Sequence, residues 1–161
     1  MGIRLNKKIK DSKVSLKTKT ISNEKFFIEI TKKKIDVNFY LKKVFDLSLG
    51  GNVIFVGTVR DSDPESNNNL NKVEYLYYEA YIPMALNEIQ KILEKYALNN
   101  GFKKAVVVHR IGVLKPGDIA ILVALSDVHR GSLFNIIDSI VKEIKEVVPI
   151  WKKEVYKSDS H

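Results

Sequence analysis

The side chains of this sequence that are best suited to chemistry are cations at the ends of expected helices and strands. The stretch IKEVVPIWKKE, residues 144–154, carries Lys145 before Pro149 and Lys152 after it. Because proline cannot continue a helix, we expect the chain to turn at Pro149, with Trp151 packed as the anchor of the turn. One interpretation is that the turn folds Lys152 back towards Lys145 and builds a site for an anion. The alternative is a solvated helix end.

Two His-Arg pairs offer a comparison within the chain. His129-Arg130 stands directly before Gly131-Ser132, where an expected strand gives way to a helix. A helix start presents free N–H groups and the positive end of the dipole, and an arginine fork suits phosphate, so this pair is a candidate anion site. His109-Arg110 lies within or at the end of an apolar strand, where we favour one packed and one solvated side chain.

Arg60, at the end of the apolar run GNVIFVGTVR, completes the set of candidate cations. Taken singly, an arginine at a strand end or a lysine at a helix end is usually only solvated. Taken together, two arginines, a histidine and two lysines at element ends predict a site for a phosphorylated small molecule.

Other kinds of active site find little support in the residues. The three histidines are far apart and the chain has no cysteine, so we expect no metal site, no thiolate chemistry and no cofactor. The sequence contains no nucleophile elbow, phosphate loop or dinucleotide fingerprint. Its carboxylates are scattered and include no convincing acid–base pair.

Composition and charge predict one globular domain behind a basic extension. The chain has 161 residues, of which 45% are hydrophobic and 29% charged, with no apolar run of membrane-spanning length and no signal-peptide core at its start. The lack of cysteine fits a reducing cytoplasm. Residues 1–25 hold eight cations and two anions, which is +6 of the formal net charge of +8. We therefore interpret residues 1–24 as a flexible extension whose removal leaves folding intact, and residues 25–161 as the domain.

The elements that must position the cations follow from hydrophobic patterns. We expect strands in residues 25–33, 52–60, 72–80, 103–114 and 119–128, with 52–60 as a central strand covered on both faces. We expect three helices: from Asp36 to a stop at Gly50-Gly51, from Pro83 to Gly101, and from Gly131-Ser132 onward. This order predicts an α+β domain with helices packed on a mainly antiparallel sheet.

Five segments, in order, resemble a known family, the catalytic subunits of molybdopterin synthase. They are GNVIFVGTVR, VEYLYYEAYIPMALNEI, VVHRIGVLKPGD, SDVHRGSLF and IKEVVPIWKKE. The family's fold is an α/β hammerhead-type domain with an extra antiparallel sheet, which is compatible with the expected element order. The sequence departs from the family in residues 1–24 and in its end, VYKSDSH, where the family commonly continues into a segment with another tryptophan.

The resemblance implies a sulfurtransferase of molybdenum cofactor biosynthesis. In that family a small ubiquitin-like subunit carries a C-terminal Gly-Gly thiocarboxylate. Two sulfurs pass in turn to cyclic pyranopterin monophosphate, a pterin, and form the dithiolene of molybdopterin. The large subunit forms a homodimer within a heterotetramer, and the resemblance implies neither nucleic acid nor membrane as a partner.

The resemblance also implies the site residues, which are assigned by matching each motif of the family to this sequence. The catalytic residues are Lys145 and Lys152. The substrate-binding residues are Thr58, Val59, Arg60, His129, Arg130, Lys145, Lys152, Lys153 and Glu154. On this basis the phosphate meets Arg60 and the His129-Arg130 pair, while the two lysines lie near the transferring sulfur. Their individual roles stay open.

Two other classes of function also stay open. A small basic RNA-binding domain is favoured by the net charge and by Tyr75, Tyr77, Tyr78 and Tyr81, although a strand places such tyrosines more readily in a core or sheet face. Salt-sensitive RNA binding by residues 25–161 would support this class. The other is a non-catalytic module that only docks a ubiquitin-like tail. An absence of pterin turnover with a thiocarboxylated partner would support this second class.

Overall fold

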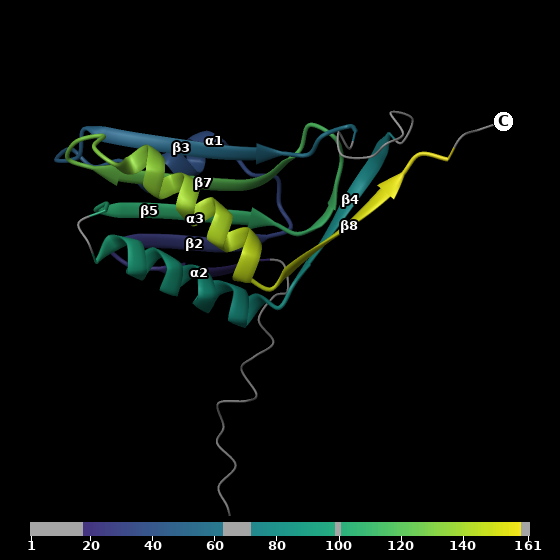
Figure 1. The fold of residues 1–161 in the computed structure, drawn as a ribbon, viewed down its shortest axis with the longest axis horizontal. Coiled ribbons are helices and arrows are strands. Elements are labelled where there is room, and N and C mark those ends of the chain that lie inside the picture. The colour runs from purple at the N-terminus through teal and green to yellow at the C-terminus, as the bar shows by residue number, and fades with distance from the viewer. Residues whose placement is uncertain (1–17, 63–71, 99–100, 159–161) are drawn as a thin grey trace, which may run out of the picture.

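The protein, described here as a computed structural model, combines two sheets and three helices within residues 18–62, 72–98 and 101–158. Helices α2 and α3 cover one face of the larger sheet, and the smaller sheet projects from one end of it (Figure 1). Both sheets are mostly antiparallel. The predicted α+β class is therefore confirmed.

The larger sheet has the strand order β1-β2-β5-β7-β3. Its strands are β1 (Thr18–Ser22), β2 (Phe26–Thr31), β3 (Gly51–Thr58), β5 (Lys104–Arg110) and β7 (Ile119–Asp127). Only β2 and β5 pair in parallel among these strands. The central strands β5 and β7 are buried almost throughout, as expected for strands covered on both faces.

The smaller sheet has the order β6-β4-β8 and is antiparallel. Its strands are β4 (Val73–Ala80), β6 (Gly112–Leu114) and β8 (Ile150–Tyr156). The expected strand 103–114 is thus two strands in two sheets. The chain changes sheets at Ile111 and Gly112, where Gly112 has φ of 91°, a left-handed conformation that favours glycine.

The helices are α1 (Val37–Leu41), α2 (Ile82–Ala97) and α3 (Leu133–Val147). Two predicted starts are confirmed, since Pro83 lies in the first turn of α2 and Ser132 is the N-cap of α3. Asp36 caps α1 as predicted, because its carboxylate accepts a hydrogen bond from Phe39 N at 3.2 Å. None of the described helices is long and apolar enough to span a membrane.

Alternation along the central strands creates a core on each face of the larger sheet. Val107 and Val123 face α2 and α3, while Val108 and Leu122 face Tyr40 and its neighbours beside α1. A third, smaller cluster lies where the smaller sheet meets the larger one. It contains Val59, Val73, Leu76, Leu114 and Ala120.

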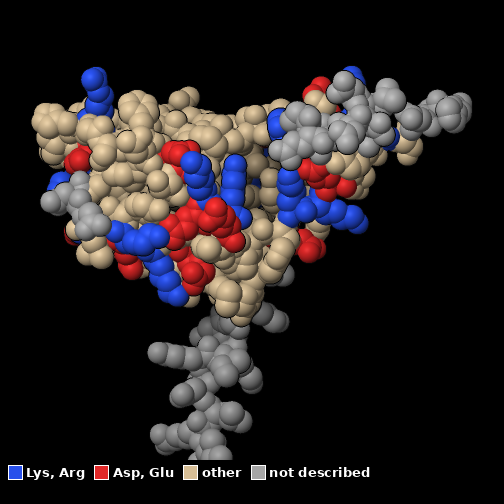
Figure 2. Space-filling view, in the orientation of Figure 1, with Lys and Arg blue, Asp and Glu red and all other residues tan. Residues whose placement is uncertain are grey.

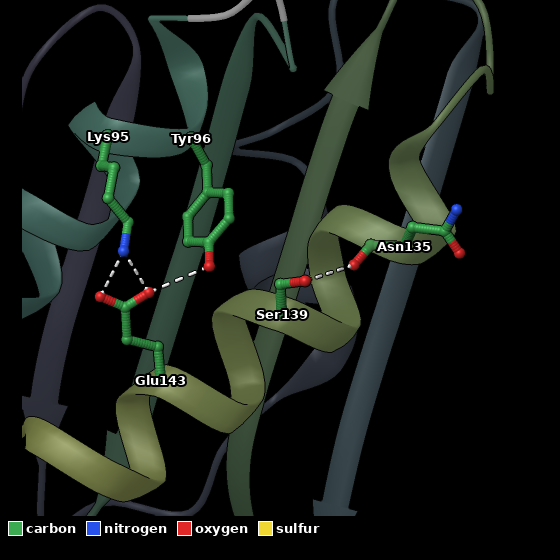
Figure 3. A network of polar contacts seen from close by, with 5 residues as sticks. All are labelled: Lys95, Tyr96, Asn135, Ser139 and Glu143. Atoms are coloured by element: carbon green, nitrogen blue, oxygen red, sulfur yellow. Dashed lines mark hydrogen bonds and ion pairs between the residues drawn. The ribbon is translucent and has the colours of Figure 1, made fainter.

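A polar network aligns α2 with α3 (Figure 3). Lys95 on α2 donates to both carboxylate oxygens of Glu143 on α3 at 2.6 Å, and Tyr96 donates to the same carboxylate at 3.0 Å. The hydrogen bond from Lys95 lowers the pKa of Glu143. The pair is exposed, so the apolar faces below it supply most of the cohesion between the helices.

Two expectations for residues 36–60 are wrong. The helix after Asp36 ends at Leu41, not at Gly50-Gly51. Gly51 instead begins β3, packed so closely on the loop after β7 that a Cβ there would lie 2.6 Å from Arg130 N. β3 is also an edge strand, because β7 is its only partner in the sheet. Alternate residues of β3 are exposed. Its apolar run does not reflect burial on both faces.

Two further expectations are corrected at the chain ends. Residues 18–22 belong to β1 and pair with β2, so the part of the proposed extension 1–24 that lies in β1 is integral to the sheet. Residues 1–17 lie outside the described residues. After Pro149 the chain forms strand β8 rather than a compact turn, and Trp151 is 59% exposed instead of packed.

We predict that deletion of residues 1–24 destabilises the fold more than deletion of residues 1–17, because only the longer deletion removes β1. The longer deletion removes the register from Thr18↔Thr31 to Ser22↔Phe27 and uncovers β2 as a new edge. Urea unfolding of both truncated chains checks this. Equal midpoints for the two deletions would show that β1 contributes nothing to stability.

We also predict that Gly51→Ala lowers the free energy of unfolding by about 1–3 kcal/mol, because the new Cβ overlaps the backbone of His129 and Arg130. The matched control is Gly50→Ala, whose Cβ meets Val128 O at 3.3 Å and requires a smaller adjustment. Thermal and urea unfolding measure both variants. A Gly51→Ala chain as stable as the Gly50→Ala chain contradicts the close approach.

Candidate active site

A cavity of about 580 Å³ lies at the junction of the two sheets, and the C-terminal end of α3 forms part of its wall. We refer to it as the junction cavity. Its polar and charged lining residues are Thr58, Arg60, Ser62, Tyr78, His109, Lys145, Lys152 and Glu154. The rest of its lining is mostly aliphatic and includes Leu76, Ile121, Ile144 and Ile150. Figure 2 shows Lys and Arg side chains on both sides of the recess where the smaller sheet meets the body.

Thr58-Val59-Arg60 enters the junction cavity from the end of β3. The pairing of β3 with β7 shifts register between Gly57 and Thr58, a bulge that redirects the chain as it leaves the sheet. Val59 then bonds the turn before β7, as its N–H donates to Asp118 O at 2.9 Å and its carbonyl accepts from Gly117 at 2.8 Å. With Val59 anchored and buried, Thr58 and Arg60 are held at the cavity.

The Pro149 break brings the two predicted catalytic lysines to the same cavity. Lys145 lies in the last turn of α3, which ends when Val148 N donates to Ile144 O. Pro149 O then accepts a hydrogen bond from Tyr81 N at 3.1 Å, so the chain is fixed as it turns into β8. Lys152 follows on β8, opposite Tyr78 of β4. Both lysines line the junction cavity.

Alternation along β8 separates the post-proline residues. Lys152 and Glu154 line the cavity, whereas Lys153 is paired with Tyr77 and is not part of the lining. Lys152 Nζ lies 2.8 Å from Glu154 Oε1, and the Tyr156 hydroxyl donates to the other carboxylate oxygen. The hydrogen bond from Lys152, and to a smaller extent the one from Tyr156, holds the pKa of Glu154 below its usual range. Lys152 therefore already has an anionic partner.

His109 is a cavity residue that the sequence analysis missed. It is 8% exposed, lines the cavity, and packs edge-on against Tyr78 with ring centroids 5.1 Å apart. Burial lowers its pKa to about 4, and the nearby charge of Lys145 acts in the same direction. The available signal was alternation, since Ala105, Val107 and His109 share the helix-covered face of β5.

Arg110 has a structural role. Its side chain is 11% exposed and lies 3.2 Å from Asp118, which anchors the turn between β6 and β7. The expectation that one member of the His109-Arg110 pair is packed and the other solvated is therefore wrong, because both are largely buried. The backbone N–H of Lys115, together with Arg110, lowers the pKa of Asp118.

The pair His129-Arg130 lies outside the junction cavity. Both side chains are exposed at the far end of β7, next to the start of β3. Ile121 lines the cavity, and Asp127 is six residues further along the strand, roughly 20 Å away. One chain therefore brings together Thr58, Val59, Arg60, Lys145, Lys152 and Glu154, but not His129, Arg130 or Lys153.

The junction cavity suits an anion attached to a flat or apolar body. Arg60, Lys145 and Lys152 provide three cations against the single carboxylate of Glu154. The aliphatic wall and Tyr78 offer a surface for a ring system. No group of three or more His, Asp or Glu side chains arranged to hold a metal ion occurs in the described part of the chain.

Comparisons with known proteins identify the family of the chain. The family model described as MoaE protein matches residues 30–147. A molybdopterin synthase catalytic subunit from Dictyostelium discoideum is 42% identical over 139 residues, which are 84% of each chain. One from Staphylococcus aureus strain COL is 37% identical over 134 residues, covering 82% of this chain and 86% of that protein.

A solved structure gives the same result for the fold. The crystal structure of molybdopterin synthase from Staphylococcus aureus aligns with a TM-score of 0.72 and 36% identity. The alignment covers 80% of this chain and 90% of that chain. The chain therefore belongs to the MoaE family, the catalytic subunits of molybdopterin synthase.

Proposed function

We propose that this chain transfers sulfur from the C-terminal thiocarboxylate of a small ubiquitin-like subunit to cyclic pyranopterin monophosphate, forming the dithiolene of molybdopterin. The observation that carries the proposal is the presence of Lys145 and Lys152 in one cavity, from elements on either side of Pro149. Both reactants are anions, so each gains from a site with an excess of positive charge.

The two lysines would act on the transferring group. An ammonium beside the thiocarboxylate steers the sulfur and stabilises charge that develops as it is transferred. A lysine also moves a proton when its neighbours change during the reaction. Glu154 occupies Lys152 at 2.8 Å, so an incoming thiocarboxylate or phosphate would compete with that carboxylate for Lys152.

Arg60 would bind the phosphate together with His129-Arg130 of a second copy. The distance along β7 prevents one chain from placing its own pair against a ligand in its own junction cavity. A homodimer, capped by the small subunits in a heterotetramer, supplies such a second copy. On this proposal each site is composite.

The similarity to synthase subunits does not favour the RNA-binding alternative. Tyr78, one of the tyrosines that favoured it, lines the junction cavity. One experiment distinguishes a docking module from a catalyst. The chain is mixed with an authentic thiocarboxylated small subunit and the cyclic precursor. Formation of molybdopterin supports catalysis. Partner binding without product supports a docking module.

We predict that Lys145→Ala and Lys152→Ala each slow sulfur transfer by roughly a hundred- to a thousand-fold, because each removes a group that acts on developing charge or a proton. Both variants should fold and bind the small subunit, since both side chains are exposed. The matched control is Lys153→Ala, on the other face of β8. Single-turnover transfer from preformed thiocarboxylate measures all three. Normal rates for both cavity variants would reduce the lysines to a solvated helix end.

We predict that Arg60→Ala and Arg130→Ala weaken binding of the precursor about ten- to a hundred-fold, as expected for loss of about 1.5–3 kcal/mol from a charge-assisted contact. Arg110→Ala should leave affinity unchanged, because Arg110 pairs with Asp118. Isothermal titration checks the affinities, and thermal unfolding identifies any loss of fold in the Arg110 variant. An Arg110 effect as large as that of Arg130 contradicts the assignment of the two pairs.

Mixed dimers test whether the site is composite. A chain with Lys145→Ala and a chain with Arg130→Ala, each impaired alone when the precursor is well below saturation, should regain activity when mixed, because one of the two sites then has both native side chains. Mixing Lys145→Ala with Lys152→Ala is the control, since these two residues line the same cavity of one chain and no site is restored. Failure of the first mixture to regain activity contradicts a shared site.

A further inference from the structure

We propose that His109 determines specificity in the junction cavity, where its Nε2 accepts a hydrogen bond from an N–H group of the heterocyclic substrate. The inference rests on the proposed function for the identity of the substrate. It goes beyond that function because the cations of the cavity recognise only negative charge. They distinguish poorly between one phosphate ester and another.

Position supports this role. His109 is the penultimate residue of β5 and pairs with Ile121 of β7, which also lines the cavity. The imidazole is 8% exposed and packs edge-on against Tyr78, at 5.1 Å between centroids and 70° between planes. A ring held between a strand and an aromatic side chain cannot turn freely. Its polar atoms therefore have fixed directions.

The hydrogen bond of Nδ1 fixes which nitrogen is the acceptor. Nδ1 lies 2.9 Å from the carbonyl oxygen of Arg110, and a carbonyl only accepts, so Nδ1 carries the proton. Burial keeps the pKa of the ring at about 4, which leaves the imidazole neutral near pH 7. Nε2 then presents a lone pair and no hydrogen.

Nε2 has no partner among the described residues. In that part of the chain, the side-chain atoms that are fully buried and have no partner are Arg110 Nε and Ser126 Oγ. His109 Nε2 is not one of them, so this unpartnered nitrogen keeps some exposed surface. Nε2 is therefore the polar atom that His109 offers to a molecule in the cavity. It is offered beside an aliphatic wall that includes Ile121 and Ile144.

The energetic consequence is selection for a donor. A largely buried acceptor that loses water without gaining a hydrogen bond costs about 1–3 kcal/mol. A ligand with an N–H group at this point avoids the cost, whereas a purely aliphatic phosphate ester does not. Sites of this type reject analogues that lack the matching group far better than apolar pockets reject analogues of different size. A pterin, whose ring carries several N–H groups, meets the requirement.

The test compares three variants of the full chain. His109→Phe and His109→Leu remove the acceptor, whereas His109→Gln keeps an amide oxygen near the position of Nε2. Isothermal titration with cyclic pyranopterin monophosphate, without the small subunit, gives Kd, and titration with inorganic phosphate reports the cations alone. We expect the Phe and Leu variants to bind the precursor about ten- to a hundred-fold more weakly and the Gln variant to remain within several-fold of the native chain. Phosphate affinity should be unchanged in all three.

The single-turnover rate at saturating precursor separates recognition from chemistry. It should stay within several-fold of the native rate in all three variants, since His109 binds substrate and does not act on the sulfur. Native precursor affinity in the Phe or Leu variant overturns the proposal. So does equal weakening of precursor and phosphate, or failure of both acceptor-free variants to fold, which would assign His109 to the core. If the native chain neither binds the precursor nor forms molybdopterin, the proposed function fails instead.

Discussion

The pairing of β8 with β4 is the constraint on which the site depends. Opposite Tyr78 the register places Lys152, and two residues later, opposite Leu76, it places Glu154. Because side chains alternate along a strand, a slip of one residue would turn both away from the cavity and bring Lys153 in. The Pro149 turn and its hydrogen bond to Tyr81 hold the start of β8 in this register. A backbone ladder therefore decides which of two adjacent lysines lines the cavity.

The charges that line the junction cavity are partly compensated within the protein, and a net positive charge remains. Arg60, Lys145 and Lys152 converge on a partly apolar recess, where uncompensated cations repel one another. Glu154 offsets part of this charge through its contact with Lys152. The neutral state of His109 avoids a fourth positive charge beside Lys145. On the proposed function, an anionic ligand would complete this compensation.

Local patterns predicted the parts of the fold that depend on neighbours in sequence. Asp36 as a cap, Pro83 in the first turn of α2 and Ser132 before α3 each follow from chemistry within a few residues. Sheet order is not local. The run from Val53 to Val56 is apolar whether β3 is central or at the edge, and its pairing with β7 alone depends on residues 66 to 72 positions away. The strand β8 was missed for the same reason, because β4 supplies its partner.

The same limit explains which site residues were recognised. The lysines were found because proline marks the break between them, and Arg60 because it ends an apolar run. The sequence does not single out His109, because its neighbours are those of a core strand, and only the meeting of two sheets makes that end of β5 a cavity wall. His129-Arg130 is the opposite case, because the sequence points to the pair but the structure places it outside the cavity. The pair precedes α3 and Lys145 lies in its last turn, about 22 Å along a helix of 15 residues. A small ligand that needs both ends of α3 must therefore lie between two chains.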